Sequence, residues 1–127
     1  MKTGMTVDIH SLNTALDMIG FSGDDLLQVE GAGAYVLING ERLRVPKDTH
    51  ATENSIKSHI IEATEDRVVN EVGPETNYSI WIEFGVQSRP NYPAQPFIRP
   101  TVAEDGSMIL NAMSDAFGET VKSRWPR

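Results

Sequence analysis

The sequence has no cysteine, no long apolar run and no excess of basic residues, and each absence removes a class of function. Without a cysteine in its 127 residues, the chain has no disulfide framework and no thiol chemistry, which suits a reducing cytoplasm. No apolar run approaches the roughly 18 residues that span a bilayer, and the first residues lack the apolar segment of a secretory signal. We therefore expect no membrane partner.

The balance of charge is acidic. The 18 Asp and Glu residues against 11 Lys and Arg residues give a net charge of −7. Such a surface offers no electrostatic footprint for holding phosphate groups, so specific binding of DNA or RNA is disfavoured. Solubility is the simpler interpretation of the acidic excess. The alternative is a surface past which DNA slides without being held.

The length and the 39% hydrophobic content are typical of a single folded domain. The chain contains no internal repeat and no low-complexity segment, so we treat residues 1–127 as one domain. Residues 86–96 form a long predicted loop that contains three prolines, and a loop of this length is a candidate interaction element. The tail at 123–127 is expected to be frayed.

Two helices are predicted in the first third of the chain. Asp8 and Ser11 are both plausible N-caps for a short helix that ends at Gly20. Ser22 then caps a second helix, whose first turn contains two aspartates at the positive end of the helix dipole.

Residues 30–45 fit two different structures. A continuing helix would end before Pro46, which cannot extend it. A β-hairpin would turn at Asn39-Gly40, between two apolar runs. Local chemistry slightly favours the hairpin, because each glycine weakens a helix by roughly 1 kcal/mol.

The middle of the chain predicts a polar loop followed by two strands. Residues 47–54 are polar and connect the flanking elements. Apolar and polar residues alternate over 55–64, as in a half-buried strand, and 67–72 is a second short strand that ends at Gly73-Pro74. The two strands are expected to form an antiparallel hairpin.

Helices are predicted for most of the C-terminal part. A short helix covers 78–84 and ends at Gly85, whereas residues 96–100 are expected to be extended because residues before proline avoid helical angles. A helix starts at Thr101, breaks at Asp105-Gly106 and continues with one apolar face. The elements together predict an α+β fold, in which a small antiparallel sheet of three to four strands packs against N-terminal and C-terminal helices.

The histidines do not have the spacing of a metal site. His10, His50 and His59 are not four residues apart, as two ligands on one helical face would be. Asp48, His50 and Glu53 are close enough in sequence to bind a metal, but a solvated loop explains them equally well. We predict no metal site.

The usual motifs of nucleophilic and nucleotide-dependent enzymes are also absent. Ser55 and Ser58 are not part of a Gly-x-Ser-x-Gly turn. Gly31 and Gly33 resemble the start of a dinucleotide-binding fingerprint, but the third glycine and the preceding strand are missing. We predict no catalytic residue and no cofactor.

Glu83 is the most informative carboxylate, because it lies in an apolar, aromatic segment where an unpaired charge is costly. A catalytic acid would need a second carboxylate or a histidine nearby. A structural carboxylate would need an arginine, and Arg99 is the natural partner because its planar guanidinium matches a carboxylate. We favour the structural pairing; the arginine could belong to the same subunit or to a neighbour.

Three segments carry motifs whose order and spacing cover nearly the whole chain. They are Pro-Lys-Asp-Thr leading to Ser-Ile at 46–56, Tyr-Ser-Ile-Trp-Ile-Glu-Phe-Gly at 78–85 and Pro-Ala-Gln-Pro-Phe-Ile-Arg-Pro at 93–100. This pattern resembles a family of small minor structural proteins of long-tailed, siphovirus-type bacteriophages, described as tail-component, tail-completion or head–tail joining proteins. The matching residues are Asp48, Thr49, Ser55, Tyr78, Glu83, Phe84, Gly85, Pro96, Phe97, Arg99 and Pro100. His50 stands where the family has a glycine, and Val86 where it has a threonine.

The resemblance implies a helix over 30–44 and a non-enzymatic virion part that is made in the bacterial cytoplasm. It implies a six-fold homo-oligomeric ring at the head-proximal end of the tail, in contact with connector and tail proteins, through which DNA passes without being specifically bound. Two alternatives remain open. One is a cytoplasmic adaptor that binds a protein through the proline-rich loop, and the other is a small hydrolase-like enzyme that uses Glu83 with His59 or His50.

Overall fold

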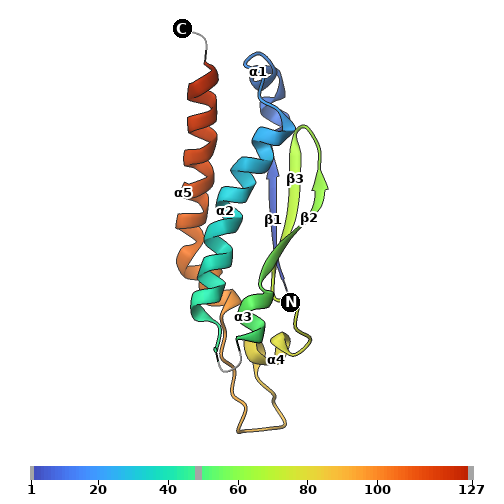
Figure 1. The fold of residues 1–127 in the computed structure, drawn as a ribbon, viewed down its shortest axis with the longest axis vertical. Helices are drawn as coiled ribbons and strands as arrows, with labels where there is room; N and C mark the ends of the chain where they lie inside the picture. The colour runs from blue at the N-terminus through green and yellow to red at the C-terminus, as the bar shows by residue number, and fades with distance from the viewer. Residues whose placement is uncertain (1, 48–49, 126–127) are drawn as a thin grey trace.

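Two long helices and a three-stranded antiparallel sheet run along the long axis of the molecule (Figure 1). The computed structural model describes residues 2–47 and 50–125, so the predicted motif residues Asp48 and Thr49 lie outside the described residues. The strands are β1 (Thr3–Asp8), β2 (Lys57–Ala63) and β3 (Arg67–Gly73), in the order β1-β3-β2. The helices are η1 (His10–Leu12), α1 (Asn13–Asp17), α2 (Gly23–Arg44), α3 (Ala51–Ser55), α4 (Ser79–Phe84) and α5 (Ile98–Arg124). The predicted α+β class is confirmed.

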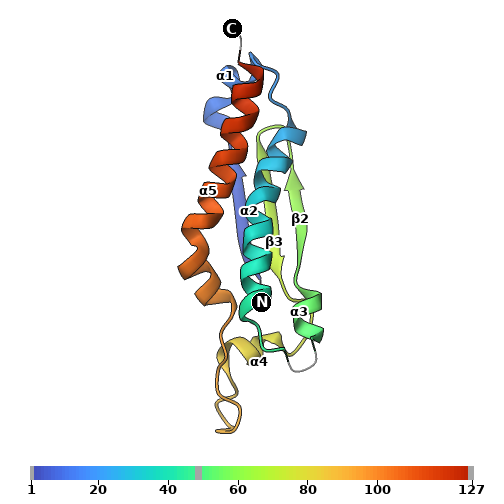
Figure 2. The same cartoon turned by 60° about the vertical axis from the view of Figure 1, so that its left-hand side comes forward.

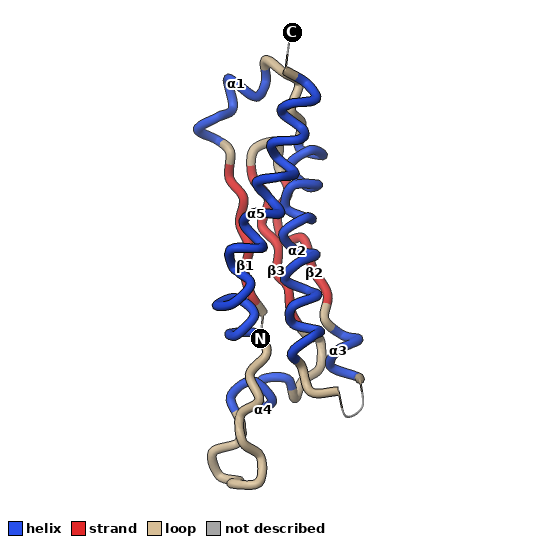
Figure 3. Tube along the Cα trace, turned by 90° about the vertical axis from the view of Figure 1, so that its left-hand side faces the viewer, coloured by secondary structure: helices blue, strands red, loops and turns tan. Residues whose placement is uncertain are grey.

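Both long helices lie on the same side of the sheet (Figures 2 and 3). α2 packs on the sheet and α5 packs on α2, and Ile109 and Met113 of α5 also join Met5 and Val72 of the sheet in one core cluster. Alternate residues of β3, Val68, Asn70 and Val72, are buried on the helical side. Glu30 of α2 accepts a hydrogen bond of 2.5 Å from the buried Asn70 amide. None of the described helices is long and apolar enough to cross a membrane.

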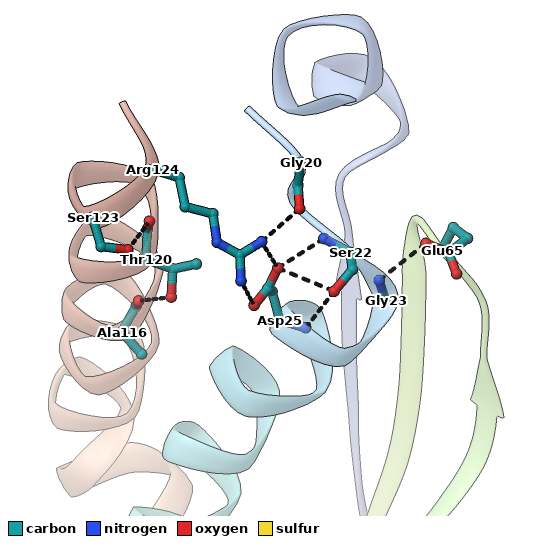
Figure 4. Close-up of polar contacts among 9 residues, drawn as sticks. All are labelled: Gly20, Ser22, Gly23, Asp25, Glu65, Ala116, Thr120, Ser123 and Arg124. Atoms are coloured by element: carbon teal, nitrogen blue, oxygen red, sulfur yellow. Dashed lines mark hydrogen bonds and ion pairs between the residues drawn. The ribbon is translucent and has the colours of Figure 1, made fainter. Parts of the chain in front are cut away.

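The start of α2 is tied to the end of α5 (Figure 4). Ser22, the predicted cap, forms a capping box with Asp25, in which each side chain accepts the backbone N–H of the other. Arg124 donates to both Asp25 oxygens, at 2.5 and 2.7 Å. Burial would raise the pKa of Asp25, but the hydrogen bonds from Ser22 and the charge of Arg124 lower it. The tail predicted to fray over 123–127 is therefore helical as far as Arg124.

Residues 30–44 belong to α2, as the resemblance implies, and the hairpin alternative is wrong. Glycine weakens helices, and the contacts of two glycines explain why α2 nevertheless contains them. A Cβ atom at Gly33 would lie 2.6 Å from Cγ of Met113, and one at Gly40 would lie 2.6 Å from Cγ2 of Thr101. Glycine therefore lets α5 approach α2 closely, and tertiary packing compensates for the low helix propensity.

Alanine substitutions in α2 should have opposite effects at a packed glycine and at a free one. We expect Gly40→Ala to lower the free energy of unfolding by about 1–3 kcal/mol, because the new methyl group overlaps α5. A Cβ atom at Gly31 would meet no described atom within 4 Å beyond the adjoining turns of its own helix, so Gly31→Ala should raise the free energy of unfolding by about 0.5–1 kcal/mol. Urea denaturation measures both. Equal effects would contradict the packing of α5 on α2.

β1 is a strand that the sequence analysis does not predict. Only Met5 and Val7 give it an alternating apolar pattern, which is a weak local signal. Its stability comes from pairing with β3, where Met5 is opposite Asn70 and Val7 is opposite Val68. The predicted short helix follows as η1 and α1, and Gly20 ends it with a φ of 72°.

β2 is present, but the expected half-buried pattern is wrong. Its residues are exposed on both faces apart from Glu62, and Ile60 and Ile61 are 48% and 58% exposed. β2 is an edge strand with an irregular register between Ile60 and Glu62. The position at the edge explains why two isoleucines do not enter the core.

Two further expectations need correction. The predicted polar loop contains α3, which follows His50, a non-glycine residue with a left-handed φ of 60°. α5 begins at Ile98, so 96–100 is not an extended segment, and the helix continues through Asp105-Gly106 without a break. Arg44 of α2 binds Asp105 at 2.7 Å and so fixes α5 at the expected break.

Candidate functional site

The carboxylate of Glu83 joins α4 to the start of α5. Glu83 is fully buried, at 0% exposure. Its Oε2 atom accepts the backbone N–H groups of Phe97 and Ile98, at 2.8 and 3.0 Å, and its Oε1 atom accepts the N–H of Arg99, at 3.0 Å. These donors belong to the first turn of a helix and have no partner within the helix. Glu83 therefore caps α5 across a separation of 14 to 16 residues.

The electrostatics of this contact favour the ionised carboxylate. Burial alone would raise the pKa of Glu83, but the amides of Ile98, Arg99 and Phe97 and the Arg99 side chain together lower it. The positive end of the α5 dipole acts in the same direction. Glu83 is thus a carboxylate anion at neutral pH, with several donors directed at it.

Arg99 completes the contact, which we call the Glu83 clamp and define as Glu83, the first-turn amides of α5 and the Arg99 side chain. Its Nε atom lies 3.0 Å from Glu83 Oε1, and its Nη2 atom donates to the Glu83 carbonyl oxygen at 2.9 Å. The guanidinium also lies 4.5 Å from the centre of the Phe84 ring. The predicted pairing of Glu83 with Arg99 is present within one chain.

Residues 86–96, which we call the arm, project beyond the body at the α4 end of the molecule (Figures 1 and 2). Gln95 N–H donates to the carbonyl of Ile82 at 2.8 Å, and Val86 N–H donates to that of Tyr92 at 3.1 Å. Gly85 enters the arm with a φ of 74°, and a Cβ atom there would lie 2.6 Å from the backbone nitrogen of Ala94. The arm is a closed loop whose two ends are held against α4.

A hollow of about 690 Å³ lies between α4 and the arm. Three of its lining side chains are exposed aromatic rings, those of Tyr78, Trp81 and Tyr92. Arg89 contributes the one charged side chain of the lining residues. Aromatic residues and arginine are the types enriched in protein interfaces.

Glu41 is a second buried carboxyl group, which the sequence analysis does not identify. It is 0% exposed, and neither of its oxygens has a hydrogen-bond partner among the described residues. Burial, and the nearby charge of Glu83, raise the pKa of Glu41 to about 8. Glu41 lies three residues after Ile38 and four residues before Val45, and these two side chains are part of a core cluster or pack against it. This helical spacing is the signal in the sequence that could have placed Glu41 on the buried face of α2.

The remaining motif residues frame the clamp or lie beside it. Phe97 is fully buried and packs with Ile56 in the core cluster next to α4. Pro100 lies in the first turn of α5, where a missing N–H breaks no helical hydrogen bond. Pro96 is exposed at the end of the arm. Ser55 lies apart in α3, where its hydroxyl accepts the N–H of Glu75 at 3.0 Å.

The histidines are engaged outside the clamp. His50 lies 3.3 Å from Glu53, and His59 lies 2.6 Å from Glu75. Within residues 2–47 and 50–125, no group of three or more His, Asp or Glu side chains is arranged to hold a metal ion.

Comparisons of the chain with protein-family models, with curated proteins and with solved structures found no match. The clamp, the arm and the hollow between α4 and the arm are therefore the features of the molecule that bear on its function.

Proposed function

We propose that the protein is a non-enzymatic structural component of a phage virion that acts in head–tail joining or tail completion. The observation that carries this proposal is the Glu83 clamp. It brings the Glu-Phe-Gly segment and the Pro-Phe-Ile-Arg-Pro segment into one buried contact that holds a projecting arm. A rigid body with a projecting, aromatic arm suits assembly against a neighbouring subunit.

The chemistry of Glu83 supports a structural role over a catalytic one. A general acid needs a raised pKa and a free oxygen near the substrate. Glu83 has a lowered pKa, is fully buried and accepts hydrogen bonds on both oxygens. His50 and His59, the partners that a catalytic role would need, pair with Glu53 and Glu75 instead.

Two further observations support the phage assignment. His50 adopts a left-handed φ of 60° at the position where the family pattern has a glycine, so the backbone there has the geometry that glycine favours. β1 and β2 both lie at edges of the sheet, where strands can pair with neighbouring chains.

We propose a six-fold ring in the virion, in contact with connector and tail proteins, and assembled in the host cytoplasm. The net charge of −7 on each chain would let DNA pass through the ring without being held.

Deletion of the open reading frame from the phage genome that encodes it tests this function. The expected lysate contains DNA-filled heads beside unattached or misformed tails in electron micrographs, together with a loss of plaques. Supplying the wild-type protein in trans should restore both. Intact, infectious virions from the deletion strain would contradict the proposal.

The hollow between α4 and the arm favours a second candidate, a cytoplasmic adaptor that binds a single protein partner. An adaptor should form a stable one-to-one complex and be absent from purified virions. Mass spectrometry of density-banded particles distinguishes the two functions, because a virion component is retained in them.

A further inference from the structure

The region around the arm is positively charged, although the chain as a whole is acidic. Residues 77–100 contain one acid, Glu83, and two arginines, Arg89 and Arg99. Glu83 is fully buried and pairs with Arg99, so the exposed Arg89 carries the positive charge that remains. Of the 18 acidic and 11 basic residues of the chain, this leaves 17 acidic and nine basic residues elsewhere. The surface that carries the hollow therefore differs in sign from the rest of the molecule.

The hollow has the composition of an interface and is already shaped. Trp81 and Tyr92 are 58% and 59% exposed, and Arg89 lies beside them in the lining. Backbone hydrogen bonds from Arg89 to Val86 and from Tyr92 to Arg89, both of 3.0 Å, hold the tip of the arm in a turn. Because the arm is held in this way, little conformational entropy has to be lost on binding.

The opposite end of the molecule is acidic. The end of β1, α1, the start of α2 and the turn between β2 and β3 all lie at the end away from the arm (Figure 1). These segments carry the exposed carboxylates of Asp8, Asp17, Asp24 and Glu65, and we call them the acidic end. Two arginines at this end are already engaged: Arg67 lies 3.4 Å from Glu62 and 3.9 Å from Asp8, and Arg124 binds Asp25.

We propose that the hollow between α4 and the arm docks the acidic end of a second copy of this chain. Opposite charges on two different surfaces of one chain favour a head-to-tail contact over a symmetric one, and such a contact generates a ring or a filament. Charge complementarity also sets the orientation of the two copies. The inference rests on the proposed function, because it names the chain itself as the partner of the arm.

Sedimentation velocity over a concentration series, up to millimolar protein at low salt, tests the docking. Wild-type protein should self-associate, and high salt should weaken the association because it screens the charges. Arg89→Glu should weaken it at least about tenfold, and so should the double substitution Asp17→Lys with Asp24→Lys. Tyr35→Ala, which removes an aromatic ring on α2 that is 69% exposed, is the matched control and should behave as wild type.

Mixing the two charge variants makes the test sharper. The Arg89→Glu protein keeps its acidic end, and the Asp17→Lys, Asp24→Lys protein keeps its arm. Each alone should be monomeric, whereas the mixture should associate, because the intact arm of one variant meets the intact acidic end of the other and the two charge-reversed surfaces also have opposite signs. Circular dichroism confirms that each variant is folded before mixing.

Two results would overturn the docking. One is a wild-type protein that stays monomeric at every concentration, and the other is self-association that Arg89→Glu leaves unchanged. Failure of this inference is distinguishable from failure of the proposed function. If the protein is monomeric but deletion of its gene still leaves heads and tails unjoined, the docking of copies is refuted. The proposed role in the virion is then still supported.

Discussion

Replacing Glu83 with alanine should lower the free energy of unfolding by about 3–5 kcal/mol, the largest effect expected for a single residue. The substitution leaves the first N–H groups of α5 without an acceptor in a buried site, and Arg99 loses its carboxylate partner. Unpaired buried donors each carry a desolvation penalty. Urea denaturation at neutral pH measures the loss.

Two comparisons separate the clamp from an ordinary ion pair. Glu104→Ala removes an acid of α5 that is 66% exposed and pairs with Arg44, and it should cost less than about 1 kcal/mol. Arg99→Met should fall between the two, because Glu83 keeps its three backbone donors. A Glu83→Ala protein as stable as Glu104→Ala would contradict the clamp. A fully stable Glu83→Gln protein that has lost a measurable turnover would favour the enzyme alternative.

Raising the pH from about 5 to about 8 should destabilise the protein by on the order of 3–5 kcal/mol through Glu41 alone. The carboxyl of Glu41 has an ordinary pKa of 4.5 when unfolded, and burial, with the charge of Glu83, raises it to about 8 in the folded state. Between these values the folded state binds one more proton than the unfolded state. Stability therefore falls as pH rises through this window and levels off above it.

Glu41→Gln should remove most of this slope, because the amide does not ionise. Denaturant unfolding from pH 5 to 9 compares it with wild type and with Glu119→Gln, an exposed control in α5. Burial also raises the pKa of Glu30, so a residual slope of the same sign remains in every protein. If the free energy of unfolding depends on pH in the same way for Glu41→Gln and wild type, Glu41 is not the group that produces the slope.

Below about pH 5, the change of stability with pH has the opposite sign. The pKa values of Glu83 and Asp25 are lowered in the folded state. Their stabilisation is present above their ordinary pKa values, 4.5 and 3.8, and is lost as the pH falls towards the lowered ones. The wild-type protein should therefore be most stable near pH 5, between the two effects.

The parts of the fold that sequence predicts well have local signals. Ser22 and Asp25 mark the start of α2, and β3 ends at the Gly73-Pro74 pair as expected. The pairing of Glu83 with Arg99 follows from the cost of an unpaired charge in an apolar segment. In the first two cases adjacent residues contain the information, and in the third the apolar residues around Glu83 show that it needs a partner.

The parts that sequence does not predict depend on distant contacts. α5 starts at Ile98 without a local side-chain cap, because Glu83 supplies the cap from α4. The Asn39-Gly40 pair looks like a hairpin turn, yet it is helical because α5 packs against Gly40. β1 has only two inward apolar residues and depends on its pairing with β3.

The central claim is that the arm held by Glu83 is an assembly element of a virion, and plaque counts after complementation of the deletion strain test it most directly. The variant is Trp81→Ala with Tyr92→Ala, which removes exposed rings from the hollow. The matched control is Tyr35→Ala with Met108→Ala, an exposed ring and an exposed apolar side chain elsewhere. With equal amounts of each soluble protein, the control should restore wild-type plaque numbers and the variant should restore few or none. Equal plaque numbers for both would contradict the account.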